Sequence, residues 1–527
     1  MGRSRFSFIF FTCFMAALAW FFVSAGMAGA SDGDDINALK AQVKELMSRI
    51  DKLEKKQKAA PASNLNAYWK NGFRIEYKNP KTENEYKFRF RTGIQMRYTY
   101  IGPDNSVKKN TEDYSNFDFR RVRFFVDGSA PNKDWHYMTQ AQLEPNAGAK
   151  LLDATVQWQK YKFARVQFGR MKLPFGMEFW QSGFMQNGGD RTIFTGDAEN
   201  DTDQFGQRTY NFPSDNSKLL VSGQELANGF ATGGMELFRS QGINVNGYVD
   251  MFGRKDFFTY MAGVFNGADT LGATNTDSQM LYVARVGFNF LPGSDPNGPM
   301  GPTGFDHYLS QGDYGYNTIP LAALVFSGFT NKDRVGSYFD TKFSSSNNNA
   351  GTKQNGLHDI ESYGLDSALL FRYLGFSTDL EGGWEEFVQN PGASAASVPE
   401  KTWDRWALRA NVGYFFVPKK WEGVFKAAYF KRLDNNSLEN SLMSGLGLVD
   451  LNNGYAIENN LQQYILGVNY YLYGFNQYIT ADVRWMRREF DSINTNDAKA
   501  LGFTGPLSSG PGSQDDLGVR VQYQYFF

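Results

Sequence analysis

The stretch 86–100 reads YKFRFRTGIQMRYTY, and it decides the fold. Aromatic and aliphatic residues recur at every second position between Tyr86 and Tyr100, and mostly basic and amide residues fill the positions between. A period of two is that of a β-strand with one apolar and one polar face. The stretch would span about 50 Å at about 3.3 Å per residue, whereas strands of soluble proteins usually have about 5–6 residues and membrane strands about 9–11. Its length therefore predicts a strand that crosses a membrane.

The same alternation recurs after residue 67. Clear examples lie at 135–143, 282–290, 405–414, 463–470, 479–485 and 517–527. We expect about 16 to 18 such segments, with an even total as in bacterial barrels. Strands in contact with lipid must satisfy every backbone hydrogen bond, so the sheet must close on itself. The predicted fold is an all-β, transmembrane, antiparallel β-barrel over residues 68–527.

The connections between these segments fall into two sizes. Short turns are predicted at 128–133, 145–148 and 473–476, and long polar stretches at 174–229, 291–318, 331–358, 388–402, 433–460 and 491–514. Short turns at one end and long loops at the other are typical of outer-membrane barrels. The last segment ends in Phe527 and resembles the terminal signature that outer-membrane assembly machinery reads.

The N-terminus carries a predicted targeting segment. A basic start with Arg3 and Arg5 precedes an apolar stretch at 6–23, and small residues follow at 28–30. This order is typical of a secretory signal peptide over residues 1–30, which is cleaved so that the mature chain begins near Ser31. A retained membrane anchor is the alternative.

A short helix is predicted next, over residues 31–58. Its apolar residues alternate spacings of three and four, which is a coiled-coil seam: Ile36, Leu39, Val43, Leu46, Ile50 and Leu53. The helix either self-associates in the periplasm or docks on the barrel. Residues 59–67, with Pro61, are predicted to form a linker.

Composition excludes several classes of protein. Aromatic residues make up 16% of the 527, and Gly is abundant at 54, which favours an all-β fold. The only cysteine, Cys13, lies in the predicted signal peptide, so the mature chain has no disulfide, thiolate metal site or attached haem. The net charge of −1 gives no indication of nucleic-acid binding. We expect no cofactor and no bound metal.

The polar faces of the predicted strands are rich in basic residues. A barrel of sixteen or more strands encloses an aqueous channel, so these faces predict the wall of a pore for small hydrophilic solutes. Rings of Arg and Lys favour anions. The predicted pore-lining residues are Lys87, Arg89, Arg91, Arg97, Arg121, Arg123, Arg165, Arg285, Arg405, Arg409, Lys426, Arg484 and Arg520. In the alternative, they form ion pairs with Asp153, Asp366, Asp379, Glu381 and Asp482 and select nothing.

Three segments carry a family resemblance. They are FRRVR at 119–123, VQFGRMKLPFGME at 166–178 and GVFNG at 263–267, together with the aromatic C-terminus. The chain resembles the phosphate-selective porin O and P family of Gram-negative outer membranes over roughly residues 68–527. The resemblance implies a homotrimer of 16-stranded barrels in the outer membrane, with a periplasmic extension, inward-folded loops that constrict the pore, and an arginine ladder.

The long stretch after Lys172 is the candidate constriction loop, with Lys172, Arg191 and Arg208 as its basic residues. Two features depart from the family. The loops are longer, and the stretch 173–229 carries acidic residues that oppose phosphate: Glu178, Asp190, Asp197, Glu199, Asp201 and Asp203. The basic strand faces predict an anion-preferring porin, and the resemblance implies phosphate-like anions among its solutes. The acidic stretch argues against phosphate as its specific solute.

Three other interpretations of the sequence are a hydrolase, a cytochrome sheath and a calcium-binding loop. A barrel-borne hydrolase needs a catalytic constellation, but the chain has only 3 histidines, His136, His307 and His358, and no Gly-x-Ser-x-Gly motif. The prediction is that the chain is not an enzyme. A sheath for an electron-transfer cytochrome remains an alternative, with any haem carried by a partner. Calcium at the alternating carboxylates of 197–203 is less expected than a solvated loop.

Overall fold

The computed structural model describes residue 45 and residues 64–82, 84–102, 113–144, 148–195, 237, 239–266, 279–291, 308–334, 359–390, 401–431, 458–490 and 512–527. The chain divides into a unit at residues 1–64 and a second unit from Leu65 to Phe527. The predicted signal peptide, all of the coiled-coil helix except residue 45, and residues 59–63 of the linker lie outside the described residues. Strand β1 begins at Leu65, within the predicted linker.

Long strands make up most of the second unit. They are β1 (Leu65–Trp69), β2 (Phe73–Lys78), β3 (Glu85–Gly102), β4 (Tyr114–Ser129), β5 (Trp135–Glu144), β6 (Gly148–Tyr161), β7 (Ala164–Lys172), β8 (Arg239–Met251), β9 (Arg254–Asn266), β10 (Met280–Leu291), β11 (Leu321–Arg334), β12 (Asp359–Tyr373), β13 (Phe376–Asn390), β14 (Lys401–Val417), β15 (Trp421–Lys431), β16 (Glu458–Tyr471), β17 (Gln477–Phe490) and β18 (Gly512–Phe526). A short helix, α3 (Met177–Trp180), follows β7. The stretch 86–100, from which the sequence analysis began, lies entirely within β3.

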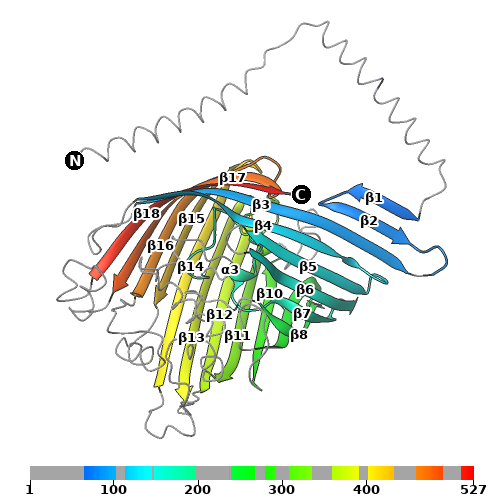
Figure 1. Cartoon of the computed structure of the whole chain (residues 1–527), viewed down its shortest axis with the longest axis horizontal. Coiled ribbons are helices and arrows are strands. Elements are labelled where there is room, and N and C mark those ends of the chain that lie inside the picture. The colour runs from blue at the N-terminus through cyan, green and yellow to red at the C-terminus, as the bar shows by residue number, and fades with distance from the viewer. Residues whose placement is uncertain are drawn as a thin grey trace, which may run out of the picture. The chain divides into compact units, whose positions relative to one another are not determined.

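The sixteen strands β3 to β18 form a closed antiparallel barrel (Figure 1). Each strand pairs with the next along the chain, and β18 pairs with β3 from Leu517↔Gly102 to Phe526↔Gly93. With β1 and β2 the sheet has 18 strands. The predicted all-β barrel is therefore confirmed, and its strand number lies at the lower end of the expected range.

The outer face of the barrel carries exposed apolar side chains and the inner face carries buried polar ones, as the alternation predicted. On β10, Tyr282 is 52% exposed on the outer face, whereas Arg285 is 5% exposed on the inner face. On β14, Leu408 is 53% exposed and the adjacent Arg409 is 3% exposed. Apolar side chains therefore cover the outside of the barrel, where closure leaves no unpaired strand edge for lipid to meet.

The hairpin β1–β2 extends the sheet beside β3. The pairing of β18 with β3 ends near Thr92, whose backbone N–H donates to the carbonyl of Phe527. From there β2 takes over the same edge of β3, from Phe73↔Phe90 to Lys78↔Glu85. The hairpin thus covers a strand edge that the stagger of the closing strands leaves open.

The two ends of the barrel carry different connections. We call the end with the short turns after Tyr373, Val417 and Tyr471 the turn end, and the opposite one the loop end. The sequence predicted that all short turns lie at one end and all long loops at the other, and two connections depart from this. Successive connections in an antiparallel barrel alternate between the ends, whatever their length. The long connection at 292–320 lies at the turn end, since Leu291 pairs with Ala322 there. The short connection at 145–147 lies at the loop end, between β5 and β6.

Helices play a small part in the described chain. The search for a helix both long enough and apolar enough to cross a membrane found none among the described residues.

Candidate functional site

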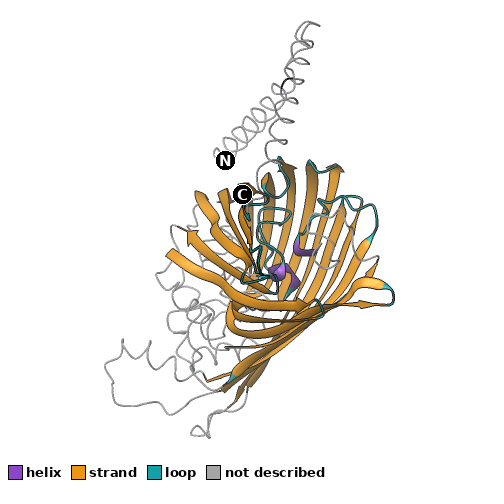
Figure 2. Cartoon of the chain, turned by 90° about the vertical axis from the view of Figure 1, so that its right-hand side faces the viewer, coloured by secondary structure: helices purple, strands orange, loops and turns teal. Residues whose placement is uncertain are grey.

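The middle of the barrel is occupied by residues 173–195, which we call the inner loop. The loop leaves the end of β7, forms α3 and lies within the circle of strands (Figure 2). Four of its apolar side chains are fully buried, at 0% exposure: Phe175, Met177, Phe179 and Phe194. Phe194, for instance, packs in one cluster with residues of β14 to β17. The predicted constriction-loop candidate thus does fold inward over its described part.

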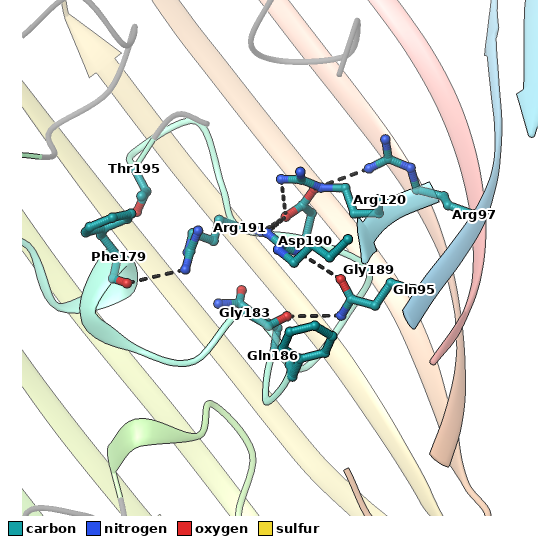
Figure 3. Close-up of polar contacts among 12 residues, drawn as sticks. Gln95, Arg97, Arg120, Phe179, Gly183, Gln186, Gly189, Asp190, Arg191 and Thr195 are labelled. Atoms are coloured by element: carbon teal, nitrogen blue, oxygen red, sulfur yellow. Dashed lines mark hydrogen bonds and ion pairs between the residues drawn. The ribbon is translucent and has the colours of Figure 1, made fainter. Parts of the chain in front are cut away.

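The carboxylate of Asp190 on the inner loop contacts four arginines, and Figure 3 shows two of them, Arg97 and Arg120. Asp190 accepts hydrogen bonds from Arg120 at 2.6 and 3.2 Å, from Arg97 at 3.3 Å and from Arg121 at 3.3 Å. The guanidinium of Arg520 lies 3.8 Å away. These five side chains are at most 1% exposed. Arg97 also pairs with Asp118 at 2.7 Å, so the four guanidiniums face two carboxylates and leave a local positive excess inside the barrel.

Further polar contacts fix the same part of the inner loop. Lys426 donates from Nζ to the backbone carbonyl of Asp190 at 2.8 Å. The backbone N–H of Gly189 donates to Asp482 at 3.0 Å, and Asp482 in turn pairs with Arg484 at 2.6 Å. Contacts to β15 and β17 therefore join those to β3, β4 and β18, so several strands hold this part of the loop.

A second, acidic cluster holds the start of the inner loop. The carboxylate of Glu178 accepts hydrogen bonds from the hydroxyls of Thr192 at 2.8 Å and Thr195 at 2.7 Å. Glu381 on β13 accepts from the backbone N–H of Glu178 at 3.0 Å and from Arg409 at 2.5 Å. Two carboxylates here share one guanidinium, which is the reverse of the balance around Asp190.

Nine of the predicted pore-lining residues lie on the inner face but are covered. They are 0–6% exposed: Arg97, Arg121, Arg123, Arg285, Arg405, Arg409, Lys426, Arg484 and Arg520. Arg123 donates to Gln142 at 2.9 Å, and Arg285 lies over the ring of Trp180 at 3.8 Å. The inner loop and the opposing strands shield these groups from water, so many of them hold the loop in place.

The ion-pair alternative describes part of this wall. The pairs Arg409–Glu381 and Arg484–Asp482 join predicted residues on both sides. The predicted acids Asp153 and Asp379 pair instead with two arginines that the sequence analysis did not select, Arg239 at 3.2 Å and Arg372 at 2.6 Å. Arg405 pairs with Glu385, and Asp366 accepts from Ser327 at 3.2 Å.

The remaining predicted basic residues lie toward the turn end and are less covered. The side chains of Arg89 and Arg91 are 26% and 20% exposed, and both pair with Asp127, at 2.6 and 2.9 Å. Arg165 lies over the ring of Tyr248 at 4.6 Å, and Lys87 pairs with Glu85 at 2.9 Å. Two guanidiniums beside one carboxylate leave a positive excess here too, where water can reach it.

The three basic candidates of the constriction loop have different outcomes. Lys172 donates to the backbone carbonyl of Phe179 at 2.8 Å. Arg191 donates to the carbonyls of Glu178 and Phe179 at 3.3 Å. Both therefore stabilise the turn of the inner loop around α3. Arg208 lies outside the described residues.

Sequence reasoning missed Arg120, because strict alternation puts it on the outer face. The pairing of β3 with β4 shifts register between Gln95 and Met96, and the extra residue brings both Arg120 and Arg121 inside. The doublet of arginines is visible in the sequence, but the shift depends on the partner strand.

Metal-binding geometry is absent from the described part of the chain. No group of three or more His, Cys, Asp or Glu side chains there could hold a metal ion. The carboxylates at 197–203, which were considered for calcium, lie outside the described residues.

Comparison with known proteins agrees with the barrel. The family model of phosphate-selective porin O and P matches residues 88–208, which include β3 from Phe88 onward, β4 and the inner loop. This match shows that the segment is similar to that family. A search of curated proteins found no match.

Several solved structures are similar in fold. OmpT, an outer membrane protein of Vibrio cholerae described in its trimer form, is 13% identical, with a TM-score of 0.42, over 84% of this chain and 99% of that one. The outer membrane channel DcaP of Acinetobacter baumannii is 10% identical, with a TM-score of 0.42, over 86% and 99%. An anion-selective porin from Comamonas acidovorans is 11% identical, with a TM-score of 0.40, over 84% and 100%.

Proposed function

We propose that this chain is an outer-membrane porin, a passive channel for small hydrophilic solutes. The observation that carries the proposal is the closed barrel of β3 to β18, apolar outside and charged inside, with a loop folded into its lumen. Sixteen strands enclose more space than their own side chains fill, so an inner loop is needed to set the width of a passage. The family match and the barrel point to a channel rather than an enzyme.

We propose further that the channel prefers anions, including phosphate-like anions. Support comes from the two places where guanidiniums outnumber carboxylates, around Asp190 and around Asp127. The cluster at Asp127 is the more direct support, since Arg89 and Arg91 are partly exposed to water. An excess of positive charge that is exposed to water raises the local concentration of anions and attracts them into the opening of a pore.

Swelling of proteoliposomes tests the channel itself. Vesicles that carry the folded protein should swell in isotonic solutions of small sugars and of small organic anions. Swelling should be faster for an organic anion than for a sugar of equal size. Vesicles with heat-unfolded protein supply the control. A folded preparation that gives no swelling with any small solute would contradict the proposal.

Assembly and processing are proposed on the sequence and the family match alone. The chain would be exported with residues 1–30 removed, inserted by the outer-membrane assembly machinery through its C-terminal strand, and assembled as a homotrimer with residues 31–58 as a periplasmic coiled coil. N-terminal sequencing of the mature protein should begin near Ser31. Native mass spectrometry in detergent should give a mass three times that of the mature chain.

A further inference from the structure

A second segment enters the barrel from the turn end. Residues 308–320, which we call the turn-end segment, directly precede β11. They belong to the long connection whose last residues lie beside the turn of β12 and β13, since Leu321 pairs with Arg372. Connections at this end are otherwise short in the described chain, yet Ser310, Gln311 and Asp313 are at most 3% exposed. The segment therefore lies inside the lumen rather than below it.

The turn-end segment and the inner loop meet through backbone hydrogen bonds. The N–H of Ser182 donates to the carbonyl of Leu309 at 2.9 Å, and the N–H of Gln311 donates to the carbonyl of Met185 at 2.9 Å. The side-chain amide of Gln311 also donates to that of Gln181 at 3.2 Å. Two segments that enter from opposite ends are thus joined as neighbouring strands of a small sheet would be.

The turn-end segment is itself fixed to the barrel wall. Arg372 donates to the carbonyl of Ser310 at 2.9 Å. The carboxylate of Asp313 accepts from the N–H of Gly375 at 2.8 Å, in the turn between β12 and β13. The ring of Tyr314 packs against Tyr471 with centroids 5.2 Å apart. These contacts hold the segment at the wall from which it enters.

One ammonium group ties both segments to the wall. Nζ of Lys426 donates to the carbonyl of Asp190 on the inner loop at 2.8 Å and to Oε1 of Gln311 on the turn-end segment at 2.9 Å. Lys426 is 0% exposed. A buried hydrogen bond to a charged donor is costly to leave unmade, so this contact favours one relative position of the two segments.

The barrel wall is covered unevenly. Inward-facing polar side chains on β14 to β18 are 0–3% exposed: Asn411, Lys426, Gln463, Asp482 and Gln522. On β6 to β9 the inward-facing residues are mixed: Asn244 and Asn246 are 1% and 4% exposed, whereas Gln157, Gln167, Tyr248 and Met261 are only partly buried. The joined segments thus lie against the first wall and leave the second one less covered.

We propose that the turn-end segment is the second half of the pore constriction, and that the solute passage runs along β6 to β9. The proposal rests on the proposed channel function and deepens it. Lys426 and Gln311 act as positioning residues, because they join the two halves. A solute of the proposed anionic class would then pass amide groups and Arg165 rather than the buried arginines around Asp190.

Cysteine variants of the full mature chain test this arrangement, because the only cysteine of the sequence lies in the predicted signal peptide. The pair Gln181→Cys and Gln311→Cys should form a disulfide on mild oxidation of folded protein, since the two side chains are buried and in contact, as seen by mass spectrometry after proteolysis. The matched pair Ser513→Cys and Gln311→Cys should not be joined, since Ser513 lies at the loop-end start of β18. Folding of each variant is checked by circular dichroism. A folded Gln181–Gln311 variant that stays unlinked would overturn the inferred contact.

Single cysteines locate the passage. Gln167→Cys should react with a water-soluble thiosulfonate at least tenfold faster than Gln463→Cys, and its modification should lower the conductance. Equal rates at the two positions would overturn the eccentric passage even if the parent protein conducts. The cross-linking and labelling rates do not depend on conductance. A parent protein that is folded but does not conduct would instead count against the proposed function.

Discussion

Arg120 on β4 donates its Nε–H to Oδ2 of Asp190 on the inner loop at 2.6 Å. Its neighbour Arg121 reaches the same carboxylate at 3.3 Å. Two adjacent residues of a strand would normally face opposite sides of the sheet, but the register shift between Gln95 and Met96 brings both inside. An irregularity in one strand pair thus gives the inner loop its main electrostatic anchor.

Asp190→Asn should destabilise the barrel and loosen the inner loop. The change leaves buried guanidiniums without their shared carboxylate, and loss of one partner of a buried ion pair costs about 3–5 kcal/mol. We expect a lower temperature for the heat-induced mobility shift on gels and noisier single-channel currents. Asp250→Asn is the matched control, since Asp250 is 60% exposed and pairs with Lys162 at 2.9 Å. An equal effect of the two variants would contradict the role of Asp190.

Gly93→Ala should displace the inner loop from β3. A Cβ atom at Gly93 would lie 2.6 Å from ring atoms of both Phe184 and Phe526. Overpacking of this kind costs about 1–3 kcal/mol. Gly102→Ala, whose Cβ would have an ordinary contact at 3.5 Å, should change the unfolding temperature little. If Gly93→Ala were as stable as the parent and equally conductive, Phe184 would not pack there as described.

Arg89→Gln should weaken the preference for anions. Arg89 is one of two partly exposed guanidiniums beside Asp127. One charge about 8 Å from a permeant ion in water attracts chloride by about 0.5 kcal/mol and repels potassium by the same amount, so its loss should lower the chloride-to-potassium permeability ratio about fivefold. Lys133→Gln removes the same charge from the exposed turn between β4 and β5 and should leave the ratio unchanged. The ratio is measured from reversal potentials, and equal shifts for both variants would argue against a local effect.

The faces of the barrel could be predicted from sequence because a period of two is local. Alternation along the strand predicts that Tyr282 lies on the outer face and Arg285 on the inner face, as observed. This prediction does not require knowledge of the neighbouring strands. Other features depend on pairings between distant segments. The inward position of Arg120 requires the register of β3 against β4, and the end to which residues 292–320 belong requires the exact number of preceding strands.

The candidate site was predicted in composition but not in arrangement. Alternation selected Arg97, Arg121 and Arg520 as a water-facing wall, whereas the inner loop covers them. The sequence analysis treated Asp190 as an acidic residue that opposes anions. In the fold its carboxylate lies among four guanidiniums, and even with Asp118 beside Arg97 the local balance is positive. No local pattern shows which charges a loop will meet when it folds into a lumen.

Insertion into a planar bilayer under a gradient of potassium chloride tests the central claim most directly. Folded mature protein should raise the current in discrete steps, and the current should reverse at a potential displaced toward the equilibrium potential of chloride. Folded protein that inserts into the bilayer without any step in current would contradict the account of the barrel as a channel.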